Sequence, residues 1–133
     1  MILDSNVVID LIEAAEDSPA YLALARISRG HRLHVNEVIF AEVSSGFAAI
    51  GQVEDLFHDI GASIARLSLA DCFRAGQAFA EYRRRGGERS TILPDFLIGA
   101  QAEIRGWPLV TRDRKGFASY FPDLEIIDPF ESI

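Results

Sequence analysis

Short apolar runs alternate with longer segments of helical periodicity along the whole chain of 133 residues. Short apolar runs between turn residues are typical of buried strands, and apolar residues that recur every three or four positions indicate amphipathic helices. The apolar runs predict strands at residues 2–3, 33–35, 64–67, 109–110 and 126–127. The periodic segments predict helices at residues 7–14, 19–29, 37–50, 53–60, 69–84, 94–105 and 115–120.

Residues that favour helix ends support several of these helices. Proline follows Ser18 and Leu93 at a predicted first turn, and Gly30, Gly86 and Gly106 each follow a helical segment. Strands that alternate with helices need crossover connections, which produce a parallel sheet covered by helices on both faces. We therefore predict an α/β fold, a three-layer α/β/α sandwich with a short central parallel sheet, formed as one domain by residues 1–133. The first strand is so short that it is expected at the buried centre of the sheet.

Composition narrows the class of protein without choosing a function. The chain is 49% hydrophobic and 25% charged, which is ordinary for a globular domain. No apolar run approaches the roughly 18 residues that span a bilayer, so we expect no membrane association and a cytoplasmic location. Cys72 is the only cysteine, which excludes an internal disulfide and fits a reducing compartment. Its neighbours Phe73 and Phe79 in a helical pattern predict a place in the core.

The net charge of −7 speaks against a nucleic-acid partner, but it says nothing about how the charges are distributed. Two divalent cations bound at an acidic site would add four positive charges and leave −3. Basic residues also gather in two short stretches, where Arg85, Arg89, Arg112, Arg114 and Lys115 are candidates for contacts with the phosphates of a nucleic acid. Solvated charges at helix ends explain the same residues equally well. The charge balance therefore chooses no partner.

Three acids stand near predicted helix starts, where a carboxylate has an ordinary structural role. Asp4 follows the first strand, Asp95 lies in the first turn after Pro94, and Asp113 follows the fourth strand. Each could cap its helix or interact with the helix dipole. The acids that follow strands would also lie together at the carboxyl edge of a parallel sheet, where such sheets place their ligands.

Glu42 has no such structural explanation. It lies in the middle of a predicted helix, on a face shared with apolar and small residues, and no basic residue occurs between positions 37 and 50. A carboxylate on a buried face is costly unless it is paired, neutralised or bound to a metal. Asp95 repeats this pattern, because its helix face continues through Ile98, Gly99 and Ala102.

Four carboxylates that meet at one edge would repel one another strongly. A single pair about 4 Å apart costs about 4 kcal/mol at an effective dielectric constant of roughly 20. Hard divalent cations such as Mg²⁺ or Mn²⁺ make such a cluster tolerable, and they can activate water for attack on a phosphodiester. The sequence thus predicts a metal site built from Asp4, Glu42, Asp95 and Asp113.

The same residues resemble the PIN-domain family, in particular the VapC-like toxins of bacterial toxin–antitoxin pairs. The opening "ILDSNVVID" resembles the family's strand-to-acid start, and "NEVIFAEV" carries the matching helical glutamate, Glu42. The segment "ILPDFLIGAQAEIRGWPLVTRDRKGFASYFPDLEIIDP" is similar to the family's carboxyl-terminal third and contains Asp95 and Asp113. The likeness extends over essentially the whole length, and the carboxyl-terminal segment is its specific part.

The resemblance implies a PIN-like fold and a Mg²⁺- or Mn²⁺-dependent endoribonuclease in which the four acids are the catalytic and metal-binding residues. It also implies a homodimer that is neutralised by a cognate VapB-like antitoxin. Asn6 and Thr111 would be supporting polar residues. Asn6 could instead cap the helix at Val7, and the Thr111 hydroxyl is expected to hold Asp113.

Two other functions remain open. A haloacid-dehalogenase-like phosphatase, another metal-dependent phosphate-ester hydrolase, needs a second aspartate two residues after the first and a lysine late in the chain. Here Asn6 stands at the first position and Lys115 is the only lysine, so the match is poor. The other alternative is a catalytically inactive PIN-fold binding module, and the intact set of four acids counts against it.

Overall fold

The computed structural model describes residues 1–15 and 17–131. Within these ranges, strands and helices follow one another in the predicted order. The strands are β1 (Ile2–Leu3), β2 (Leu33–Val35), β3 (Ala62–Ile64), β4 (Leu109–Val110) and β5 (Ile126–Ile127). The helices are α1 (Ser5–Glu13), α2 (Pro19–Ile27), α3 (Glu37–Ser44), α4 (Ile50–Asp59), α5 (Leu69–Arg84), α6 (Pro94–Arg105) and α7 (Arg114–Ala118).

The strands of the described residues form one parallel sheet in the order β3-β2-β1-β4-β5. At its centre, Ile2 of β1 pairs with His34 of β2 on one side and with Leu109 of β4 on the other. Both residues of β1 are fully buried, so two residues suffice for a strand because neighbours hold them on both sides. The pairing continues one residue further, since the Asp4 N–H group donates to the Val110 carbonyl group (2.9 Å).

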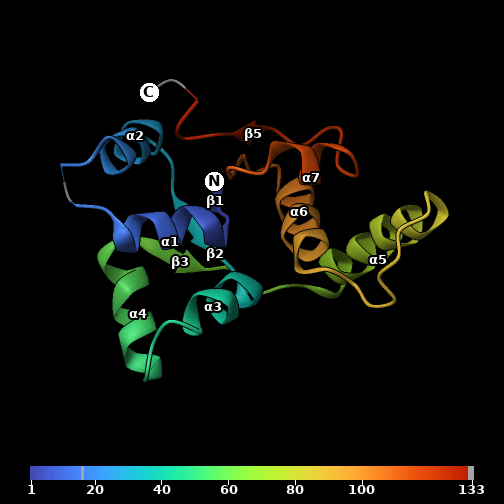
Figure 1. The fold of residues 1–133 in the computed structure, drawn as a ribbon, viewed down its shortest axis with the longest axis horizontal. Helices are drawn as coiled ribbons and strands as arrows, with labels where there is room; N and C mark the ends of the chain where they lie inside the picture. The colour runs from blue at the N-terminus through green and yellow to red at the C-terminus, as the bar shows by residue number, and fades with distance from the viewer. Residues whose placement is uncertain (16, 132–133) are drawn as a thin grey trace.

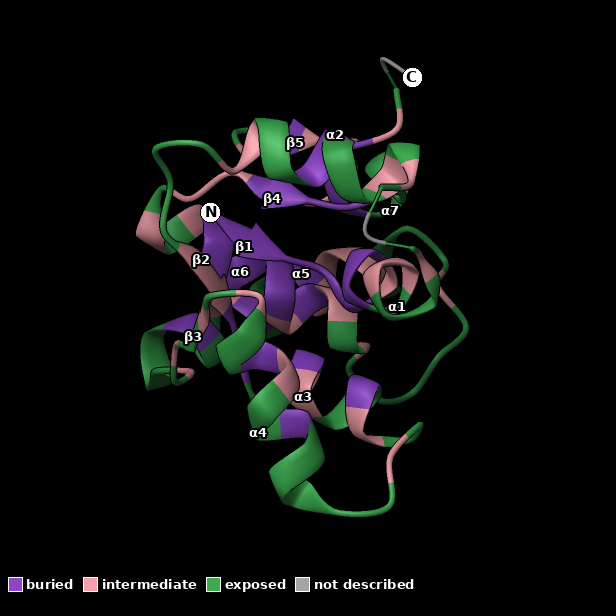
Figure 2. Ribbon diagram, turned by 90° about the vertical axis from the view of Figure 1, so that its left-hand side faces the viewer, coloured by how far each residue is buried: buried purple, intermediate pink, exposed green. Residues whose placement is uncertain are grey.

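Helices cover both faces of the sheet, and the predicted three-layer α/β/α fold is confirmed. In Figure 1, α1, α2 and α4 lie on one side of the strands, and α5, α6 and α7 lie on the other. Helix α3 contacts α1, α4 and α6, so it joins the two helical layers. Figure 2 shows β1 and β4 as buried strands inside the molecule. No helix in residues 1–15 or 17–131 has the length and apolarity needed to cross a bilayer.

Several element boundaries differ from the predicted ones, and two of the differences have a clear local cause. Strand β3 occupies residues 62–64 rather than 64–67, because Gly61 adopts a left-handed conformation (φ 73°) after α4 and pairing with β2 begins at Ala62. The helix predicted over residues 37–50 ends at Ser44, whose hydroxyl donates to the Phe40 carbonyl group (2.6 Å). The Gln52 side chain then accepts two backbone N–H groups just before α4 (3.0 and 3.1 Å), which starts a separate helix.

The prediction that Cys72 packs in the core is wrong. Its side chain is exposed, and the ring of Phe73 beside it is 70% exposed. Helix α5 packs through Ala75, Ala78 and the partly buried Phe79 instead. Because the apolar residues of α5 are distributed around the helix, their spacing does not identify the packed face.

The smaller of two core clusters lies between α5, α6 and the segment after α7, and it depends on a close approach at Gly99. A Cβ atom at position 99 would lie 2.5 Å from the Phe121 ring, which is itself 1% exposed. Helix α6 reaches this position only because residue 99 lacks a side chain. Asp95 lies one turn earlier on the same face of α6, so this contact also sets where that acid lies.

Gly99→Ala is expected to lower the free energy of unfolding by about 1–3 kcal/mol, because the buried Phe121 ring has no room to move. Gly76→Ala on α5 is the matched control, since a Cβ atom there meets nothing within 4 Å. The control should gain about 0.5–1 kcal/mol from the higher helix propensity of alanine. Urea denaturation measures both changes, and equal effects of the two substitutions would contradict the close approach.

Candidate metal centre

Asp4 lies at the carboxyl end of the central strand and is 4% exposed. Its Oδ1 atom accepts hydrogen bonds from the Ser5 N–H group (2.8 Å) and, less closely, from the Ser5 hydroxyl (3.4 Å). Its Oδ2 atom accepts a short hydrogen bond from the Thr111 hydroxyl (2.7 Å). Burial is the largest influence and raises the pKa of Asp4; the hydrogen bonds oppose this rise, and the charge of Asp113 adds to it.

Asp4 is also the N-cap of α1, which begins at Ser5, two residues earlier than predicted. A capping role and a place in the site are therefore compatible. The interpretation of Asn6 as the cap of a helix beginning at Val7 is wrong, because Asn6 lies in the first turn of α1. Its amide instead joins α1 to the segment after β4: Nδ2 donates to the Thr111 hydroxyl (3.2 Å), and Oδ1 accepts from the backbone of residue 112 (3.4 Å).

Thr111 is the junction of this network and is 0% exposed. Its hydroxyl donates its proton to Asp4 and accepts from the Asn6 amide and from the backbone N–H group of Asp113 (3.1 Å). The expectation that this hydroxyl holds Asp113 is confirmed, and the bond is to the backbone of that residue. The register between β1 and β4 also places Asp4 within its reach.

Glu42 reaches the same network from α3. Its Oε1 atom accepts a hydrogen bond from the Ser5 hydroxyl (3.0 Å), whose other neighbour is Asp4. The prediction that Glu42 lies on a buried face is wrong: Ile39 and Val43 face the core, and Glu42 itself is exposed. Partial desolvation nevertheless raises its pKa, and the charge of Asp4 raises it further.

Asp95 lies in the first turn of α6, behind Pro94. Its pKa is raised to about 6, first by desolvation and then by the negative charges of Asp4, Asp113 and Glu42, in that order. No hydrogen bond or positive charge from the described residues opposes this rise. The four predicted acids are therefore close enough to act on one another electrostatically.

Asp113 completes the set at the start of α7, where it is the N-cap. Its Oδ1 atom accepts a hydrogen bond from the Gly116 N–H group (3.1 Å), so its predicted capping role is confirmed. A Cβ atom at position 116 would lie 2.6 Å from the Asp113 Oδ2 atom, so the absence of a side chain at Gly116 makes space for the Asp113 carboxylate. The side chain is exposed and faces solvent at the edge of the sheet.

The chemistry of these groups suits a hydrated divalent cation. In the described residues, no arginine or lysine forms an ion pair with any of the four acids. Their donors are all oxygen atoms, which hard cations prefer. No three acid, histidine or cysteine side chains in the described ranges form a ready-made metal site. Because Mg²⁺ keeps several of its waters, widely spaced carboxylates can still hold it through bridging water molecules.

Most of the basic residues predicted to contact RNA are already engaged. Arg112 and Arg114 flank Asp113 in the chain, and each pairs with an acid from another segment. Arg85 pairs with an acid of its own helix and also donates to a carbonyl group just after α7 (3.0 Å), which brings the end of α5 beside α7. Lys115 and Arg89 are exposed, and neither forms an ion pair with a described residue.

Sequence reasoning missed three polar residues that support the site. Ser5 joins Asp4 to Glu42, as described above. Asn36 and Gln101 are both 0% exposed, and the Asn36 Nδ2 atom donates to the Gln101 Oε1 atom (2.9 Å). The Asn36 side chain also caps α3, and Gln101 donates to the backbone after β3 (3.0 Å). The sequence signal for Gln101 was its position as a polar residue on the otherwise apolar face of α6.

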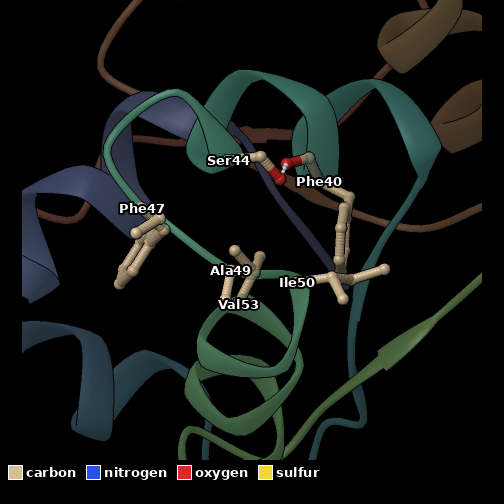
Figure 3. A pocket seen from close by; sticks show the side chains of 7 residues that line it. Phe40, Ser44, Phe47, Ala49, Ile50 and Val53 are labelled. Atoms are coloured by element: carbon tan, nitrogen blue, oxygen red, sulfur yellow. Dashed lines mark hydrogen bonds between the residues drawn. The ribbon is translucent and has the colours of Figure 1, made fainter.

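Two surface grooves border α3, the helix that carries Glu42. Figure 3 shows an apolar groove of about 250 Å³ between α3 and α4, lined by Phe40, Phe47, Ile50 and Val53. A second cleft, of about 360 Å³, runs between α1 and α3, and Glu42 lines it.

Residues 1–120 match the family model described as PIN domain. The chain belongs to the PIN-domain family. The resemblance seen in the sequence is thus confirmed at the level of the family and the fold. A comparison with curated proteins gave no match.

Solved structures share this PIN fold over nearly the whole chain. A chain of VapBC2 from Rickettsia felis, solved with a DNA fragment from its promoter, has a TM-score of 0.73 at 20% identity, covering 95% of this chain and 96% of that one. A chain of a toxin–antitoxin complex from Klebsiella pneumoniae has a TM-score of 0.71 at 24% identity, with 98% of each chain covered. A chain of VapBC-1 from nontypeable Haemophilus influenzae gives 0.73 at 18% identity, again with 98% of each chain covered.

Thr111→Val is expected to lower the free energy of unfolding by about 1–2 kcal/mol near neutral pH, because the buried Asp4 carboxylate loses the hydrogen bond that the Thr111 hydroxyl donates. Since that hydrogen bond favours the charged form of Asp4, its loss should raise the pKa of Asp4 further. The destabilisation should therefore be smaller in acid, where Asp4 is protonated. Thr111→Ser keeps the hydroxyl and is the control; a loss in Thr111→Val no larger than the loss in Thr111→Ser would contradict the role of the hydroxyl.

The raised pKa of Asp95 predicts a pH-dependent stability. The folded chain holds this proton more tightly than the unfolded chain, so stability falls as pH rises from 3.8 to about 6. Asp95→Asn without metal should therefore be more stable than the wild type near pH 7.5 by about 1–2 kcal/mol, a value reduced for partial exposure. Urea denaturation in EDTA, at about pH 3.5 and about pH 7.5, measures the difference in free energy of unfolding between Asp95→Asn and the wild type. This difference should vanish at the lower pH.

Asp55→Asn, at an exposed position on α4, is the control for that measurement. It makes the same chemical change outside the four acids and should leave stability within about 0.5 kcal/mol of the wild type at both pH values. A stabilisation of the two variants by the same amount would contradict the electrostatic coupling at Asp95.

Proposed function

We propose that this PIN-domain chain is a Mg²⁺- or Mn²⁺-dependent endoribonuclease that hydrolyses RNA phosphodiester bonds and acts as a VapC-like toxin. The observation that carries the proposal is the arrangement of the four acids: Asp4, Glu42 and Asp113 all lie near enough to Asp95 for their charges to act on it, and no arginine or lysine of the described residues forms an ion pair with any of the four. A protein that accepts this repulsion at the carboxyl edge of its sheet lowers its own stability. A bound divalent cation would offset two of the four negative charges and so reduce this repulsion.

Asp4 and Asp95 would be the direct ligands, and Glu42 and Asp113 would bind the metal directly or through water. When bound, the metal supplies a water of lowered pKa and a positive charge beside the phosphate. The chain's own groups prepare this site. The donors around Asp4 favour its charged form, and the Gly116 N–H group orients the Asp113 carboxylate.

The supporting residues keep two segments of the chain in register. Asn6 and Thr111 bind one another across α1 and the segment after β4, so the acid of each segment stays fixed relative to the other. Ser5 does the same for Asp4 and Glu42. These are positioning roles, and the carboxylates are the groups that would meet the cation.

The proposed partners follow from the fold relatives. The Klebsiella protein was solved as a toxin–antitoxin complex, and the other two carry VapBC names. We extend this to a cognate VapB-like antitoxin for the present chain and to a homodimer as its own assembly. RNA and an antitoxin are cytoplasmic molecules, so the activity belongs in the cytoplasm.

The test is cleavage of total cellular RNA by the purified, antitoxin-free protein in Mg²⁺, in Mn²⁺ and in EDTA. We expect discrete fragments with either metal, none in EDTA, and a loss of at least about 100-fold for Asp95→Asn, because a ligand and a negative charge are removed together. Asp55→Asn is the matched control and should cleave as the wild type does.

Two results would remove the proposal. Cleavage that persists in EDTA or in Asp95→Asn would show that the four acids are not the catalytic centre. Absence of cleavage in any metal, together with no thermal stabilisation by millimolar Mg²⁺ or Mn²⁺, would favour the inactive binding module. Release of inorganic phosphate from a small ester would favour the other metal-dependent hydrolase.

A further inference from the structure

The two arginines that flank Asp113 are both held by carboxylates from distant parts of the chain. The Arg112 Nε atom lies 2.7 Å from the Asp10 Oδ2 atom, and its Nη2 atom donates to Asp10 Oδ1 (3.3 Å). The Arg114 Nη2 atom lies 3.1 Å from the Glu131 Oε2 atom. Asp10 belongs to α1 and Glu131 to the segment after β5, so separate elements supply one acid to each arginine.

The Arg114–Glu131 pair is open to solvent, with side chains that are 49% and 68% exposed. The Arg112–Asp10 pair is partly covered: the Arg112 side chain is 49% exposed, but the Asp10 side chain is 25% exposed and its Oδ2 atom is buried. Exposed ion pairs contribute little to stability because water screens them. Arg112 also borders an open cleft of about 430 Å³ that Asp10 and Glu13 line. A competing anion can therefore reach these guanidinium groups without unfolding any element.

The backbone beneath the two arginines is fixed. The Arg112 N–H group donates to the Asn6 side chain (3.4 Å), and the neighbouring Thr111 and Asp113 are tied into the hydrogen bonds of the candidate centre. A change of partner thus needs only side-chain rotation. The planar guanidinium group binds phosphate as readily as carboxylate, through the same paired N–H donors.

We infer that Asp10 and Glu131 occupy Arg112 and Arg114 in the free protein, and that RNA phosphates on either side of the cleaved bond displace these two carboxylates. The inference rests on the proposed RNA substrate. In this inference Asp10 and Glu131 compete with RNA phosphates for the two arginines. Each acid weakens RNA binding by the free energy needed to break its ion pair. The free protein then shows little positive charge beside its four acids, and an RNA strand exposes that charge as it binds.

The test measures binding of a fluorescein-labelled single-stranded RNA 20-mer in Mg²⁺ by fluorescence anisotropy. All variants carry Asp95→Asn to prevent cleavage. Asp10→Asn and Glu131→Gln should each bind about two- to fivefold more tightly than the parent, the range expected for release of an exposed ion pair. Glu13→Gln is the matched control, because it removes the same charge from the same helix and cleft but has no arginine partner in the described residues.

Arg112→Gln provides the decisive comparison. It should weaken binding and reduce the slope of log affinity against log salt by about 0.7, as expected for the loss of one phosphate contact on a single strand. Asp10→Asn should then have no further effect in the Arg112→Gln background, because the acid acts only through that arginine. Circular dichroism of each variant verifies that the fold is intact.

Three outcomes would overturn the inference. Asp10→Asn could leave affinity unchanged, could weaken it as a structural brace would, or could tighten it no more than Glu13→Gln does. If the chain with Asp95 intact still cleaves RNA, these outcomes refute only the displacement of the two carboxylates by RNA phosphates. The proposed function then remains. Absence of both binding and cleavage would remove both proposals.

Discussion

The carboxyl edge of this sheet is organised around one buried charge. Asp4 ends a fully buried strand, so its carboxylate loses most of its hydration. The fold replaces that hydration with donors from Ser5 and Thr111. Each donor has a second partner: Ser5 reaches Glu42, and Thr111 holds Asn6 and the backbone of residue 113. The groups that make one buried acid tolerable thus also hold Glu42 and the backbone of Asp113 in place.

The remaining repulsion is left uncompensated at Asp95, where burial and three negative charges act without an opposing donor. Elsewhere the chain pairs its buried acids. Asp71, which is 0% exposed, lies 2.9 Å from the Arg105 guanidinium group and forms a capping box with Ser68. The chain thus neutralises Asp71 and leaves Asp95 unpaired. A stability cost of this kind at Asp95 is typical of functional sites.

Three of the four acids carry local signals, because Asp4, Asp95 and Asp113 stand at strand ends or helix starts. Glu42 was singled out for a buried face that the structure does not have, and the absence of a basic residue within its helix is the part of that signal that remains. The positions of the central strand and of the helical layers follow from the same short-range patterns. The order of the elements along the chain therefore agrees with the prediction.

Features that depend on distant residues were not predictable. The hydrogen bond from Thr111 to Asp4 joins positions 107 residues apart, and the register of β1 against β4 creates it. The partner of Arg112 is 102 residues away on α1. The exposure of Cys72 depends on which face of α5 meets α6, and a helix with apolar residues on several faces does not specify that choice.

The hydrogen bond between Asn36 and Gln101 links the two helices that carry Glu42 and Asp95. It fastens the start of α3 to the middle of α6 inside the protein. The Glu42 and Asp113 carboxylates lie at the exposed side, where they accept hydrogen bonds from the Ser5 hydroxyl and from the Gly116 N–H group. In the proposed metal centre, the buried links would set the spacing of the helices, and the exposed carboxylates would adapt to ions of different radius by side-chain rotation.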